Sequence, residues 1–148
     1  ARAHAAGEGT QVELSLGAGS GTRGDTPLAA RFRVAALGDG RFTGTGPFYR
    51  GARFELGPMA LLELGGVRVA VASRKQQAAD QAMFRHLRAE PADHAVLVLK
   101  SSVHFRADFG SMADRILVVE APGPNIADPA KLPFGNLRPG MRTSPRRR

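Results

Sequence analysis

The chain contains no cysteine and no tryptophan, and none of its apolar runs is long. Without cysteine, disulfide bonds and zinc sites built from thiolates are excluded. A helix that crosses a bilayer needs roughly 18 or more apolar residues, and no stretch of this sequence approaches that length. These absences suit a reducing compartment, and the expected location is the cytoplasm.

Lysine is also scarce, because only Lys75, Lys100 and Lys131 among the 21 basic residues are lysine. The many arginines give a net charge of +8, which would suit contacts with phosphates. However, the arginines are scattered, and the run at residues 146–148 indicates a solvated tail. A basic anion- or nucleic-acid-binding module is therefore the alternative function. A structural or oligomerisation domain is a third possibility.

A chain of 148 residues with 43% hydrophobic residues has the size and composition of one domain with a single core. We assign this domain to residues 1–139. The Arg-rich residues 140–148 are expected to form a disordered tail.

Alternating apolar and polar residues in the first half predict an antiparallel β meander. Gly65 and Gly66 are expected to form a tight turn, and residues 38–40 have the composition of a hairpin turn. The predicted strands cover residues 11–16, 28–37, 52–56, 59–64 and 67–72.

The pattern changes in the second half, where residues 76–88 lack glycine and proline and carry a helical apolar stripe. Residues 95–99 and 116–119 are continuous apolar runs, which are typical of strands covered on both faces. A short helix between them, over residues 102–114, would make a βαβ-type unit. Prolines from position 122 onward predict an irregular C-terminal tail. The predicted fold class is therefore α+β.

Polar residues gather where the predicted strand 95–99 meets the next helix. Ser101 or Ser102 suits the helix N-cap, and backbone N–H groups at a helix start can stabilise an anion. Lys100, His104 and Arg106 add a cation, a titratable imidazole and a forked donor. Helix capping and a surface histidine paired with Asp108 four residues later would explain the same pattern without chemistry.

Ser73, Arg74 and Gln76 form a second polar junction after the strand at residues 67–72. If the two strands end side by side, these residues share one site with Ser101 and His104. Ordinary capping is again the alternative. Metal ligands are not expected in this chain, because its histidines lack the spacing of a helical two-histidine site.

These two junctions carry a resemblance to a known family. The run K-S-S-V-H-F-R-A at residues 100–107 resembles the hallmark segment in the C-terminal domain of the MlrC-like (microcystin-degradation protein) metallopeptidases. Residues 73–77 resemble the S-R-x-Q segment of that family. Weaker resemblances occur, in the same order along the chain as in the family, at residues 5–7, 12–17, 120–123, 132–134 and 137–139.

The resemblance implies a two-domain zinc metallopeptidase that acts on small or linearised peptides. In that family the N-terminal domain carries the zinc, so the chain alone is not expected to be active. His104 and Lys100 match positions that line the cleft between the two domains, and they are our candidate catalytic residues. The residues expected to bind substrate at the interdomain cleft are Ser73, Arg74, Gln76, Ser101 and Arg106. The expected partners are that N-terminal domain and a peptide substrate, and a homo-oligomer of the chain is an alternative.

Overall fold

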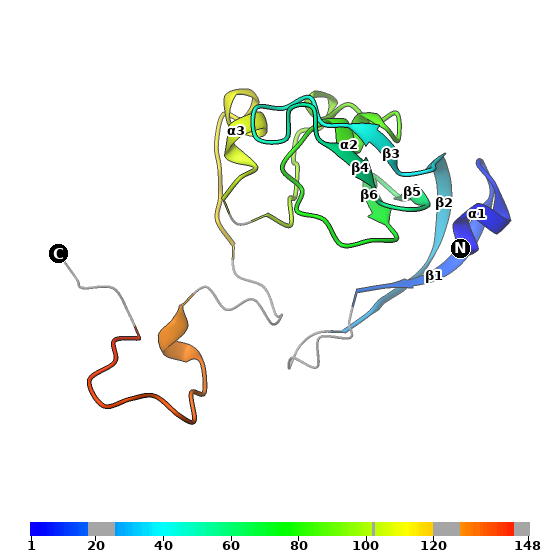
Figure 1. The fold of residues 1–148 in the computed structure, drawn as a ribbon. Helices are drawn as coiled ribbons and strands as arrows, with labels where there is room; N and C mark the ends of the chain where they lie inside the picture. The colour runs from blue at the N-terminus through cyan, green and yellow to red at the C-terminus, as the bar shows by residue number, and fades with distance from the viewer. Residues whose placement is uncertain (18–25, 102, 120–127, 144–148) are drawn as a thin grey trace. The chain divides into compact units, whose positions relative to one another are not determined.

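The computed structural model describes residues 1–17, 26–101, 103–119 and 128–143 (Figure 1). The chain divides into two compact units by its internal contacts. One unit comprises Ala1–Ser15 and Ala29–Ile116, and the other comprises Leu16–Leu28 and Leu117–Arg148.

A four-stranded sheet with the order β1-β2-β5-β6 forms the centre of the first unit. Its strands are β1 (Gln11–Leu16), β2 (Leu28–Gly38), β5 (Met59–Leu64) and β6 (Val67–Ala72). β5 pairs antiparallel with both β2 and β6, and Leu64 lies opposite Val67 across the turn at Gly65 and Gly66. Gly65 has a φ of 58°, a conformation that glycine adopts without strain. The predicted strands of this sheet are confirmed.

The meander is interrupted, because β2 pairs with β5 rather than with the next strand along the chain. The intervening β3 (Arg41–Thr43) and β4 (Arg53–Glu55) pair with each other in a separate two-stranded sheet. The residues after β3 include Gly44, Gly46 and Pro47, which shorten that strand. The first four residues of β5 are all buried, and β5 lies between β2 and β6 in the four-stranded sheet.

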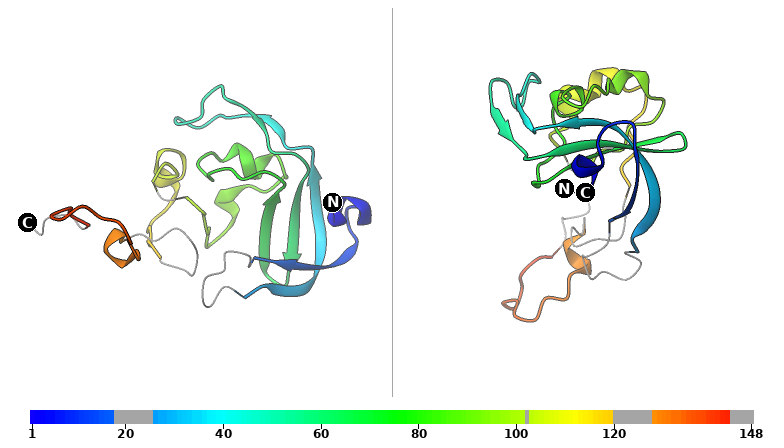
Figure 2. Two further views of the ribbon diagram at one scale, coloured as in Figure 1. Left: turned by 60° about the horizontal axis from the view of Figure 1, so that its bottom comes forward. Right: turned by 90° about the vertical axis from the view of Figure 1, so that its right-hand side faces the viewer.

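The core lies between β2 and β5 of the sheet and the segment that follows β6. Ala36 and Leu61 from the sheet contact a cluster that includes Met83 and Leu87, and Leu87 is fully buried. Each large apolar side chain buried in this way contributes roughly 1.5–3 kcal/mol. Two short helices, α2 (Ala82–Arg85) and α3 (Arg106–Phe109), lie along one side of the sheet (Figure 2).

The helix predicted over residues 76–88 is wrong for its first half. Residues 75–80 have no regular secondary structure, and α2 has only four residues. The side chain of Asp80 accepts hydrogen bonds from backbone N–H groups, including that of Ala82. Such bonds from an aspartate side chain compete with helix formation and stop the helix from extending toward the N-terminus.

The two buried strands predicted at residues 95–99 and 116–119 are also not formed. Val96 and Val98 are 78% and 82% exposed, and neither segment pairs with a strand among the described residues. Leu117, Val118 and Val119 are each at least 74% exposed. A strand of this composition needs pairing and cover on both faces, and the described residues supply neither. The α+β class is confirmed by the two sheets and the short helices, without a βαβ crossover.

Residues 128–143, the described part of the proline-rich C-terminal tail, have little regular structure, as predicted. A short 3-10 helix, η3 (Pro129–Lys131), is capped by Asp128, whose Oδ1 accepts from the backbone N–H of Ala130 at 3.0 Å. The arginine run at residues 146–148 lies outside the described residues. Throughout the described ranges, every helix is too short to cross a membrane.

Candidate functional site

Gln77 joins the two polar junctions that the sequence singled out. Its Oε1 lies 3.0 Å from Nδ1 of His104. Its Nε2 donates to Oγ of Ser101 at 2.9 Å. Ser101 and His104, which follow Gln77 by 24 and 27 positions, therefore both contact its amide group.

Aromatic rings complete this arrangement. The ring of Phe48 stacks on the imidazole of His104 with 4.1 Å between centroids and 11° between planes. Tyr49 contacts Phe48 edge-on, and the hydroxyl of Tyr49 accepts a hydrogen bond from Nε2 of Gln76 at 2.8 Å. We call these residues the His104 cluster: Phe48, Tyr49, Gln76, Gln77, Ser101 and His104.

Asp80 holds the loop that carries Phe48. Its side chain is fully buried, and it accepts from the backbone N–H groups of Gly46 and Ala82, each at 2.9 Å. The hydroxyl of Thr45 is a third, longer donor at 3.5 Å. A buried carboxylate needs such donors to offset the loss of water. Asp80 therefore fixes the 44–48 loop to the start of α2.

Asp108 fixes α3 to the same region. Its Oδ2 accepts from the backbone N–H of Gln81 at 2.7 Å, and its carbonyl accepts from the Gln81 side chain at 2.6 Å. The sequence spacing allowed a pair between Asp108 and His104, but Asp108 is paired with Gln81 instead. A β-carbon at Gly46 would lie 2.5 Å from Cγ of Asp108, so only glycine permits the loop to approach α3 this closely.

Ser73 and Arg74 are held elsewhere. The hydroxyl of Ser73 donates to the carbonyl of Pro58 at 2.6 Å. The guanidinium of Arg74 donates to the carbonyl of Glu55 at 3.0 Å. Both side chains are exposed, and no hydrogen bond in the described part of the chain connects them to the His104 cluster. Of the second junction, Gln76 and its neighbour Gln77 reach the cluster.

Lys100 and Arg106 are exposed on either side of Ser101 and His104 in the sequence. The guanidinium carbon of Arg106 lies 5.0 Å from the centroid of the Phe105 ring. Neither cation forms an ion pair with a described residue, so both are available to an anionic group. The capping role predicted for Ser101 or Ser102 is wrong, because α3 begins at Arg106 with Phe105 at its N-cap. Ser101 instead accepts from Gln77, and Ser102 lies outside the described residues. A four-residue helix also provides no extended array of N–H groups for an anion.

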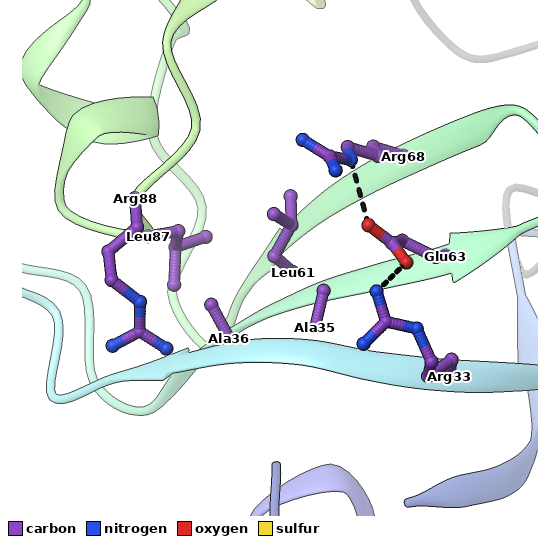
Figure 3. A pocket seen from close by; sticks show the side chains of 8 residues that line it. All are labelled: Arg33, Ala35, Ala36, Leu61, Glu63, Arg68, Leu87 and Arg88. Atoms are coloured by element: carbon purple, nitrogen blue, oxygen red, sulfur yellow. Dashed lines mark hydrogen bonds and ion pairs between the residues drawn. The ribbon is translucent and has the colours of Figure 1, made fainter. Parts of the chain in front are cut away.

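A pocket beside β2, β5 and β6 is lined by three arginines, and Figure 3 shows two of them, Arg33 and Arg68, in contact with Glu63. Arg33 and Arg68 both contact Glu63, and Arg88 pairs with Glu8 at 2.6 Å. Partial burial alone would raise the pKa of Glu63, but the two arginines outweigh this and hold that pKa below its ordinary value of 4.5. The pocket shares no residue with the His104 cluster, and each of its arginines already contacts a carboxylate.

The described residues do not fit a zinc centre. No three side chains of the histidine, cysteine, aspartate or glutamate type lie close enough there to hold a metal ion. A catalytic zinc site takes three protein ligands of these types. The described residues by themselves therefore do not form a catalytic zinc site.

Comparisons with known proteins add to this geometry. The family described as "MlrC C-terminus" matches residues 1–136. Microcystinase C from Sphingomonas sp. is 28% identical over 114 residues, which are 77% of this chain and 22% of that protein. The crystal structure of a candidate metallopeptidase from Mesorhizobium sp. BNC1 is similar with a TM-score of 0.78 and 28% identity. That match covers 92% of this chain and 27% of the Mesorhizobium chain, so this chain spans about a quarter of such relatives.

Proposed function

Because the chain belongs to the family of the MlrC C-terminus, we propose that it is the C-terminal domain of a zinc metallopeptidase that acts on small or linearised peptides. Two longer relatives, Microcystinase C and the Mesorhizobium protein, support a peptidase. The part of the protein beyond this chain would hold the metal, for which zinc is the proposed identity. The proposed location is the cytoplasm.

The observation that carries the proposal is the His104 cluster. An exposed imidazole is held on one edge by Gln77 and on one face by Phe48, so its orientation is fixed while part of it stays open. A fixed, accessible imidazole is suited to move a proton or to donate to developing negative charge. His104 is the proposed catalytic residue of this domain, with Lys100 as a nearby positive charge.

The cations and amides near His104 would orient the peptide. Arg106 can bind a peptide carboxylate through two parallel N–H groups, and Arg74 is the other proposed carboxylate ligand. Ser101 and Gln76 offer neutral hydrogen-bonding groups to the peptide backbone. Ser73 is proposed to act with Arg74 at the margin of the site, since both side chains are exposed.

The apolar segment at residues 95–99 supports a domain boundary next to this site. Val96 and Val98 are exposed, whereas Leu97 and Leu99 are half-buried, so one side of the segment faces away from the chain's own core. The segment leads directly into Lys100 and Ser101. We propose that the metal-binding part of the same polypeptide covers these valines, which would place the His104 cluster at the interdomain cleft.

The direct test is His104→Ala in the full-length protein. Loss of a general acid or base costs about a hundredfold in turnover, and we expect that loss in kcat with the fold and the metal content unchanged. His94→Ala is the matched control, because His94 has no hydrogen bond from its side chain to a described residue. Unchanged kcat in the His104→Ala enzyme would remove this histidine from the mechanism.

A further inference from the structure

We propose that Gln77 is a positioning residue that keeps the proton of neutral His104 on Nδ1 and leaves the lone pair on Nε2. This inference rests on the proposed function for its purpose, but it concerns a property that can be measured without activity. It also decides between two roles of the imidazole. A histidine in this form begins the reaction as a proton acceptor at Nε2, not as an N–H donor to an oxyanion.

The two ends of the Gln77 amide have opposite hydrogen-bonding roles. An amide carries one oxygen, which only accepts, and one NH₂ group, which only donates. The NH₂ group is directed to Oγ of Ser101, so the oxygen is the end that faces His104 Nδ1. A carbonyl oxygen at 3.0 Å requires an N–H on that nitrogen. Because a neutral imidazole has a single N–H, Nε2 must carry the lone pair.

Phe48 fixes the direction of that lone pair. Its ring lies nearly parallel to the imidazole, so a partial rotation of the imidazole about its bond to Cβ would break the stack. A half-turn would keep the stack but would lose the contact of Nδ1 with Gln77. Within the described part of the chain Nε2 has no hydrogen-bond partner, and the His104 side chain is exposed. Nε2 is therefore the nitrogen that can meet a group from outside the chain.

The consequence for hydrolysis is a defined proton path. Nε2 accepts a proton from the attacking water as its oxygen forms a bond to the peptide carbonyl carbon, which makes His104 an imidazolium. The Nδ1–H continues to donate to Gln77 Oε1 throughout. Nε2 then returns the proton to the amine nitrogen as the C–N bond breaks, which restores the neutral histidine.

The test is the ¹⁵N NMR signal of the His104 ring nitrogens in the 148-residue chain at a pH where the ring is neutral. The His104 signals are identified by their loss in His104→Gln. We expect the Nδ1–H tautomer in the wild-type chain. In Gln77→Leu, which removes the acceptor, we expect the Nε2–H tautomer that free histidine prefers. Gln77→Glu keeps an acceptor and should restore Nδ1–H.

Gln76→Leu is the matched control, because the neighbouring Gln76 contacts Tyr49 and not His104. It should leave the tautomer unchanged. An Nε2–H tautomer in the wild-type chain would mean that the amide is turned the other way, and it would overturn the proposal. An unchanged tautomer in Gln77→Leu would do the same.

The outcome is separable from that of the proposed function. A tautomer that depends on Gln77 together with normal turnover in His104→Ala would reject the catalytic role but keep the positioning role. In the full-length enzyme, Gln77→Leu should lower kcat about tenfold with little change in KM, as expected of a residue that orients another.

Discussion

At the residue scale, the position of the 44–48 loop depends most directly on Asp80. We expect Asp80→Ala to lower the free energy of unfolding by about 2–4 kcal/mol, because it leaves the buried N–H groups of Gly46 and Ala82 without acceptors. Urea unfolding of the chain measures this change. Asp93→Ala, at an exposed aspartate, should stay within about 0.5 kcal/mol of the wild type. Equal stability of the two variants would contradict the role of Asp80.

Single residues also show where sequence reasoning reaches its limit. Ser101 and His104 could be singled out because their residue types carry chemistry. The sequence alone does not single out Gln77, although this residue contacts both. An amide has no distinctive pattern in sequence, and its contacts depend on where the chain turns after β6. The nearest signal was its place beside Gln76, directly after the S-R-x-Q segment.

At the scale of the elements, Glu63 links three strands, since it lies on β5 and contacts Arg33 on β2 and Arg68 on β6. Its pKa is lowered in the folded state, although partial burial alone would raise it, because the two arginines stabilise the charged form. The stabilisation is therefore present above pH 4.5 and is lost as the pH falls through the lowered pKa.

The expected result is a difference between wild type and Glu63→Gln that shrinks on acidification. At neutral pH the variant should be less stable by at most about 1 kcal/mol, since the arginines are largely exposed and water screens the pairs. Urea unfolding at a series of pH values, repeated at high salt, measures this difference. A gap that stays constant with pH would show that the ion pairs do not stabilise the sheet.

The elements differ in how far the sequence predicts them, for physical reasons. Strands β1, β2 and β6 follow from alternation of apolar and polar residues, a local pattern set by one buried face, whereas β5 is a short apolar run with four consecutive buried residues. The pairing of β2 with β5 depends on long-range competition between strands, which alternation does not encode. The first half of the helix predicted over residues 76–88 is not formed, because the buried carboxylate of Asp80 accepts the backbone N–H of Ala82, which a longer helix would have used.

At the scale of the whole molecule, the chain has the composition of a piece that packs against something else. Residues 95–99 and 116–119 have the composition of buried strands, yet Val98 and Val118 are about four-fifths exposed. The apolar side chains of these two segments are therefore not covered by the described residues. The net charge of +8 is less informative, because several arginines are paired with carboxylates on the surface.

We infer that this chain orients substrate while the metal is bound by the rest of the polypeptide. Bound zinc and peptidase activity are compared in the full-length protein and in the 148-residue chain. We expect stoichiometric zinc and cleavage of a linear peptide by the full-length protein, and neither by the chain alone. Stoichiometric zinc bound by the 148-residue chain, or peptide cleavage by it, would show that this division between the two parts is wrong.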